Sequence, residues 1–156
     1  MPKRHHTRRA VLLAVFASGV SCASPLSLAE LLDLAAAKAR WEARRYTSYA
    51  IEELQSCFCP SEITQWVRVE VVDGTVVRAA IVESGAAISR SQLGLFRTVE
   101  RVFDDISGAG DDQWVEDVIA EYDPILGFPT RVDLVPKQGL VDAGLAIYLR
   151  NPTPIP

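Results

Sequence analysis

Histidine and methionine are almost absent from the sequence. Its 156 residues include two histidines, His5 and His6, and one methionine, Met1. If the N-terminal segment is removed, no Ser-His-Asp or Cys-His nucleophile can be assembled. Histidine-ligated zinc and copper sites built on histidine or methionine are excluded as well. The composition therefore favours a protein that is not an enzyme and that holds no metal and no cofactor.

Long apolar runs are also scarce. Four basic residues and no acidic residue in the first nine positions precede an apolar run from Ala10 to Val20, which is too short to anchor the chain across a bilayer. This order predicts a secretory signal over residues 1–21. Cleavage before Cys22 resembles processing of a bacterial lipoprotein and makes Cys22 the lipidation site, whereas cleavage after Ala23 gives a soluble secreted form.

Positive charge is scarce beyond the leader. Removal of residues 1–21 takes away four of the 16 basic residues and leaves 12 against 20 acidic residues, a net charge of −8. Such a chain has no electrostatic reason to bind nucleic acid or anionic lipid. We therefore expect contact with a membrane only through a lipid anchor. The expected location is the cell envelope, or the periplasm or extracellular space for a form without lipid.

Two stretches have the spacing of amphipathic helices. The first begins at a capping box, Ser27-Leu28-Ala29-Glu30. Its apolar residues form one stripe, the side that an amphipathic helix turns towards the core, and Trp41 is expected to close it. The residues of this stripe are Leu28, Leu31, Leu32, Ala35 and Ala39. The second helix is predicted from Leu95 to Ile106, and Gly108 and Gly110 end it.

Strand patterns fill most of the remaining chain. Strands are predicted over residues 46–54, 63–71, 114–122, 128–135 and 141–150, with a further strand after the turn at Asp73-Gly74. Residues that pair across a hairpin face the same side of the sheet, and this parity favours a three-residue loop at the turn, which pairs Val69 with Val77. The proline-rich residues 151–156 are expected to stay outside the ladder as a tail.

The element order α-β-β-β-α-β-β-β predicts an α+β fold. Two similar α-β-β-β halves would form a largely antiparallel sheet with both helices packed on one face. Residues 22–150 are long enough for one domain with a single core. The predicted organisation is thus a leader over residues 1–21, a single domain over residues 22–150 and a tail.

Several segments together resemble a family of secreted bacterial proteins and lipoproteins, the domain of unknown function 6174. The resemblance covers Trp41 to Leu149. It rests on Trp41, the Tyr46 and Tyr49 pair, Cys57-Phe58-Cys59, the valine-rich hairpin at Asp73-Gly74, the helix with Leu95-Phe96, and the stretch YDPILGFPT from Tyr122 to Thr130. These motifs are structural in kind. The family has no established activity, so the resemblance implies no catalytic residue.

Cys57 and Cys59 allow three interpretations, of which a disulfide is favoured. Cα atoms two residues apart in a strand lie about 6.6 Å apart, at the upper limit for a disulfide, so the bond needs a bend, which Pro60 favours. Lipidation of Cys22 would leave this even pair in an oxidising compartment. A redox centre is disfavoured because the sequence shows no neighbouring lysine or arginine. A metal site lacks histidine to complete its ligands.

The candidate binding surface comprises Trp66, Tyr122, Asp123 and Phe128. Trp66 falls on the polar side of its strand, among charged residues. The stretch YDPILGFP is explained by turn chemistry, and its alternative role is a recognition loop. The predicted function is a non-catalytic exported domain, lipid-anchored at the envelope, that binds a protein or a small ligand. The alternatives are a thiol redox or metal-binding protein that uses Cys57 and Cys59, and a secreted enzyme inhibitor.

Overall fold

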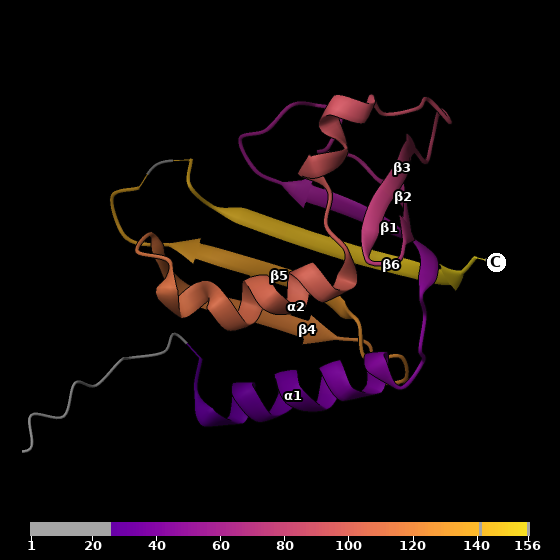
Figure 1. Cartoon of the computed structure of the whole chain (residues 1–156). Helices are drawn as coiled ribbons and strands as arrows, with labels where there is room; N and C mark the ends of the chain where they lie inside the picture. The colour runs from indigo at the N-terminus through magenta and orange to yellow at the C-terminus, as the bar shows by residue number, and fades with distance from the viewer. Residues whose placement is uncertain (1–25, 141, 156) are drawn as a thin grey trace, which may run out of the picture.

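The structure, a computed structural model, describes residues 26–140 and 142–155. The predicted leader over residues 1–21 and the lipidation site Cys22 lie outside the described residues. The elements within them are shown in Figure 1. They are α1 Leu28–Glu42, β1 Ser48–Ser56, β2 Val67–Val72, β3 Thr75–Ile81, the 3-10 helix η1 Arg90–Leu95, α2 Val99–Gly108, the 3-10 helix η2 Ala109–Asp111, β4 Val115–Tyr122, β5 Pro129–Pro136 and β6 Leu145–Pro154.

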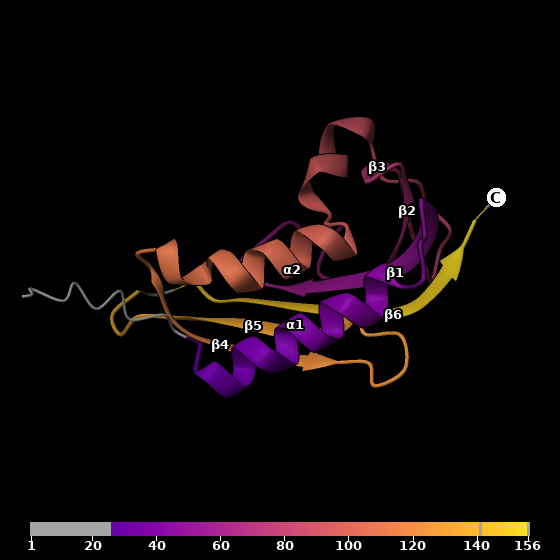
Figure 2. The same cartoon turned by 60° about the horizontal axis from the view of Figure 1, so that its bottom comes forward.

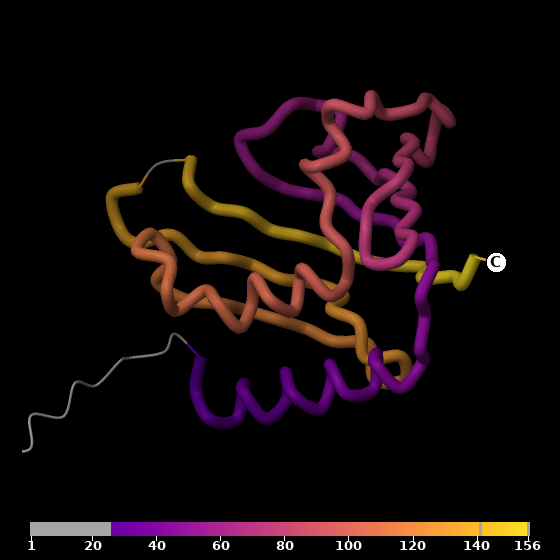
Figure 3. The backbone as a smooth tube through the Cα atoms, in the orientation of Figure 1, coloured from indigo at the N-terminus to yellow at the C-terminus, as the bar shows by residue number. Residues whose placement is uncertain are grey.

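The strands form one antiparallel sheet in the order β3-β2-β1-β6-β5-β4. β1 and β6 lie side by side at its centre, although they are the first and last strands of the described chain. Figure 3 shows how the chain path brings these two segments together. The prediction of an α+β fold with an antiparallel sheet is confirmed.

One face of β1 and β2 is buried. Side chains of a strand alternate between its two faces, and the inward residues of β1 and β2 are Tyr49, Ile51, Glu53, Gln55, Val67, Val69 and Val71. Buried residues of α1 and α2 belong to the same core cluster, and Figure 2 shows both helices against the sheet. Within the described residues, neither helix combines the length and the apolar character that a membrane crossing requires.

The apolar stripe predicted for α1 is exposed, so that prediction is wrong. The capping box itself is confirmed, since Ser27 N–H donates to Glu30 Oε2 at 2.7 Å and Glu30 N–H donates to Ser27 Oγ at 3.3 Å. The buried residues of the helix are Leu34, Ala37 and Trp41. The helix has apolar residues on two sides, and the side with the large Trp41 ring packs on the core because that ring buries the most apolar surface.

The β2–β3 hairpin also differs from its prediction. Val72 pairs with Thr75, so the loop has two residues, Asp73 and Gly74, with φ angles of 48° and 72°. Positive φ at both positions is typical of the type I′ turn. The register then shifts between Glu70 and Val71, and Val69 pairs with Ala79. The extra residue that parity requires is therefore a bulge inside β3 instead of a third loop residue.

The second helix begins later than its apolar spacing predicts. Thr98 has extended backbone angles and its Oγ1 accepts the Arg101 N–H at 3.1 Å, so α2 begins at Val99. Leu95 lies in η1, and Phe96 follows it and is buried. The predicted end at Gly108 is confirmed.

The prediction of a tail over residues 151–156 is wrong, because β6 continues to Pro154. Tyr49 pairs with Pro154, and Ile155 N–H donates to Ser48 O at 3.2 Å. β5 pairs with β6 only as far as Tyr148. The later residues of β6 therefore have a neighbouring strand on one side only, β1, and proline is tolerated at such an edge. Asn151, with φ of 55°, lies at the register shift between β1 and β6 and accommodates the prolines in a bulge.

The loop between β4 and β5 is fastened to the end of α1. Asp123 Oδ1 accepts the N–H groups of Ile125 and Leu126 at 2.9 and 2.6 Å, and Arg44 Nη2 donates to Ile125 O at 2.6 Å. Gly127 has φ of 88°, and a Cβ at this position would overlap the carbonyl oxygen of Ala37. Glycine is thus required here by both conformation and close approach.

We predict that Gly127→Ala lowers the free energy of unfolding by about 3 kcal/mol, from strained backbone and overlap with α1 together. Gly139→Ala is the matched control, because Gly139 has φ of 91° and no atom within 4 Å of an added Cβ. The control should cost about 1 kcal/mol, the backbone strain alone. Urea denaturation measures both, and equal losses would show that the approach to α1 is not a constraint.

Candidate functional site

The chain bends sharply where β1 ends, and a disulfide joins Cys57 to Cys59. Their Cα atoms lie 5.2 Å apart. This distance is shorter than the 6.6 Å or so of an extended strand, so the predicted bend and the disulfide interpretation agree with the structure. Both cysteines pack against the core cluster, whereas Phe58 between them is 87% exposed. The three residues, called here the CFC loop, hold an aromatic ring in solvent.

The CFC loop borders a cavity of about 720 Å³. Its apolar lining includes Phe58, Leu95, Phe96, Trp114 and Leu145, and its charged lining comprises Arg97, Arg101, Asp105 and Asp142. A second hollow, of about 560 Å³, shares Cys57, Phe58 and Leu145 with the first and extends towards β5. The CFC loop thus lies between two hollows of the surface.

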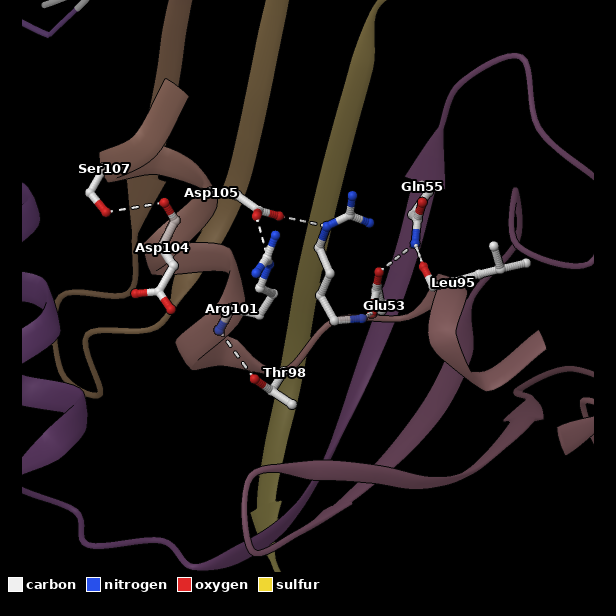
Figure 4. A network of polar contacts seen from close by, with 9 residues as sticks. Glu53, Gln55, Leu95, Thr98, Arg101, Asp104, Asp105 and Ser107 are labelled. Carbon is white, nitrogen blue, oxygen red and sulfur yellow. Dashed lines mark hydrogen bonds and ion pairs between the residues drawn. The ribbon is translucent and has the colours of Figure 1, made fainter. Parts of the chain in front are cut away.

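Two arginines also line the larger cavity, Arg97 from the segment before α2 and Arg101 from the first turn of α2. Arg97 Nε lies 2.7 Å from Asp105 Oδ2, and Arg101 Nε lies 2.9 Å from Asp105 Oδ1 (Figure 4). The sequence shows no lysine or arginine next to the cysteines, and the fold brings these two arginines to the lining of the same cavity. The spacing of Arg101 and Asp105 signals an ion pair on one helix face. Nothing in the sequence places that pair beside a loop more than 40 residues earlier.

A buried carboxyl group lies behind this cavity. Glu53 is fully buried on β1, where its Oε2 accepts the Arg97 N–H at 3.0 Å and its Oε1 accepts from Gln55 Nε2 at 2.7 Å. Gln55 Nε2 also donates to Leu95 O at 2.7 Å. Burial raises the pKa of Glu53 to about 7, and the two hydrogen bonds offset part of that effect. Glu53 and Gln55 thus hold the segment before α2 against β1.

Trp66 is less available than predicted. The guanidinium carbon of Arg150 lies 3.7 Å from the centroid of the Trp66 ring, a cation–π contact that covers part of it. Arg150 is held in turn by Glu52, with Nε 2.7 Å from Oε2. Trp66 thus belongs to a polar cluster with Arg150 and Glu52 on the outer sheet face.

The other predicted surface residues lie near α1 and serve the fold. Phe128 is buried, with its ring centroid 6.2 Å from that of Trp41, so the prediction that it faces a partner is wrong. The Asp123 carboxylate is engaged in its own turn. Tyr122 is half-buried and lines a separate cavity of about 370 Å³ between α1 and β4. Burial there, with Asp33 and Glu30 nearby, raises the pKa of Tyr122 to about 12.

The arrangement contains groups suited to binding. Among the residues that the structure describes, no three Cys, Asp, Glu or His side chains are grouped as a metal would require. The CFC loop and its cavity combine exposed apolar surface with fixed charges, a composition typical of a recognition site.

The fold and this site define a small antiparallel α+β domain with a disulfide-closed loop at the end of its central strand. The chain belongs to a family of unknown function, DUF6174, whose model matches residues 33–154. That match includes all six strands and most of α1, and it confirms the resemblance. No curated protein and no solved structure shows a significant match.

The buried Glu53 predicts a pH-dependent stability. Its pKa is higher in the folded protein than in the unfolded chain, so the folded state holds a proton that the unfolded state has released. Stability should therefore fall by about 2 kcal/mol between pH 5 and pH 8. Urea denaturation across this range measures the decline, which Glu53→Gln should abolish. An equal decline in the variant would assign it to other groups.

Proposed function

We propose that this protein is a non-catalytic exported domain, anchored to the cell envelope by a lipid on Cys22, that binds a protein partner through the CFC loop. The observation that carries the proposal is Phe58, 87% exposed within a disulfide ring. A phenylalanine in solvent contributes nothing to the core. Aromatic side chains that become buried on binding are frequent anchors of protein interfaces, and Phe58 lines two hollows of the surface where it could serve as one.

The disulfide supports this use of Phe58. A bond across three residues contributes only about 1.6 kcal/mol by loop entropy, so its main effect is on local shape. A loop whose backbone is held in one shape loses little backbone freedom when a partner covers it. The hollows of about 720 and 560 Å³ on either side of Phe58 offer space for side chains of that partner.

Export and lipidation are supported by the sequence. The basic N-terminal residues, the apolar run and Cys22 have the order of a lipoprotein signal. A disulfide as small as that of the CFC loop needs an oxidising compartment to persist, which an exported protein has. If the partner is an enzyme, the same loop would act as an inhibitor.

Thiol exchange at Cys57 and Cys59 is the second candidate, because Arg97 and Arg101 line the same cavity and positive charge favours a thiolate. Asp105 opposes this effect, since it pairs with both arginines. Thiol titration of the native protein separates the two functions. A disulfide that resists mild reductants supports binding, and one that is readily reduced and reformed supports redox exchange.

We predict that Phe58→Ala reduces recovery of the partner by at least tenfold when envelope proteins are cross-linked to the native protein and counted by mass spectrometry. Loss of a central aromatic anchor typically costs that much. The matched control is Ile125→Ala, which removes an exposed apolar side chain from the β4–β5 loop. Unchanged recovery with Phe58→Ala, or an equal loss with Ile125→Ala, would contradict the assignment to the CFC loop.

A second prediction concerns the anchor. Mass spectrometry of the protein from cell membranes should find residue 22 as the N-terminus, with acyl chains on Cys22 and an oxidised Cys57–Cys59 pair. Cys22→Ser should move the protein to the soluble fraction, because acyl chains supply the membrane affinity. An unmodified Cys22, or membrane retention of the variant, would rule out the lipid anchor.

A further inference from the structure

The outward side of α1 is an apolar surface with no role in the core. We define the outer face of α1 as Leu28, Leu31, Leu32, Ala35 and Ala39, all exposed. Leu28, Leu31 and Leu32 are 74%, 39% and 63% exposed. Spacings of three and four residues place them on one stripe, opposite the buried Leu34, Ala37 and Trp41. A continuous apolar stripe of this kind marks a surface that something covers.

The sequence before α1 limits what can cover it. Cys22 precedes Leu28 by six residues, and even a fully extended chain of that length spans only about 20 Å. The helix itself is 15 residues long, or about 22 Å. If Cys22 carries the lipid, the start of α1 is thus held within roughly one helix length of the membrane surface.

We propose that the outer face of α1 lies in the interface of the membrane that holds the lipid anchor, an inference that rests on the proposed lipidation of Cys22. An amphipathic helix next to an acyl chain supplies the second membrane contact that stable attachment generally requires. The leucines enter the acyl boundary, while the opposite side of α1 stays on the core through Trp41.

The charges around this face add little to its attraction for a membrane, so the proposed contact is mainly apolar. Glu30 and Asp33 line the cavity between α1 and β4, whereas helical spacing places the exposed Glu42 on this face and Lys38 at its edge, where Lys38 pairs with Asp104 at 3.6 Å. Arg44 donates to the Ile125 carbonyl. With the carboxylate of Glu42 on this face and these cations engaged within the domain, attraction to anionic headgroups contributes little. The helix therefore binds neutral and anionic membranes alike.

The orientation has a consequence for the binding site. Figure 1 places α1 at the lower side of the molecule and the loop that follows β1 at the upper side, with the sheet between them. A membrane beneath α1 leaves the CFC loop pointing away from the lipid surface. The loop that contains Phe58 then lies on the side of the molecule away from the membrane, where a protein partner can reach it.

The test uses the acylated protein in phosphatidylcholine vesicles, labelled with an environment-sensitive fluorophore at Leu32→Cys. The cysteines of the disulfide and the acylated Cys22 do not react with the label. The matched control is Val77→Cys, an exposed apolar position on β3. We expect a blue shift of about 10 nm or more and protection from an aqueous quencher at position 32 and neither at position 77, since only the former lies in lipid.

Four outcomes decide the matter. A shift at position 32 that persists when the protein is diluted in lipid, and that anionic lipid leaves unchanged, supports the inference. A water-like signal at both positions on acylated protein overturns the inference and leaves the anchor standing. A shift that disappears on dilution, with cross-linking between two Leu32→Cys copies, overturns it in favour of self-association. Absence of acyl chains on Cys22 overturns the anchor and the inference together.

Discussion

The carboxylate of Glu100 joins three elements, and the rest of the architecture depends on that junction. It accepts hydrogen bonds from Trp41 Nε1 and Tyr49 Oη, each at 2.7 Å, and Tyr49 Oη accepts the Val99 N–H at 2.8 Å. α1, β1 and the first turn of α2 are thus tied at one point, and a carboxylate suits the positive end of α2. Burial beside Glu100 raises the pKa of Tyr49, which keeps the hydroxyl protonated and able to donate.

Both proposed binding surfaces follow from this junction. Because the Trp41 ring must reach Glu100 and Tyr49, α1 turns Leu34 and Ala37 inward, and its outer face is left in solvent. Because α2 begins beside Tyr49, the segment before it passes over Glu53, whose carboxyl group accepts the Arg97 N–H. The Arg97–Asp105 pair then lines the cavity next to the disulfide loop.

Local chemistry made much of the fold predictable. The capping box at Ser27, the bend at Cys57 and Cys59 and the turn at Asp73-Gly74 each depend on residues close in sequence. The hairpin register was missed by the position of one bulge, since parity requires an extra residue without saying where it lies. The strand through Asn151 to Pro154 was missed because proline disfavours a ladder on both sides, whereas β6 there bonds to β1 alone.

The sequence by itself determined the scarcity of histidine, the acidic balance, the short tether between Cys22 and α1, and the cysteine pair two residues apart. These are properties of composition and spacing that folding does not change. The tertiary structure decided which of two apolar sides of α1 is buried, that Phe128 is core while Phe58 is exposed, and that two arginines line the same cavity as the disulfide. The reason is that a single core has room for only some of the apolar side chains, and the packing of the whole chain determines which of them are buried.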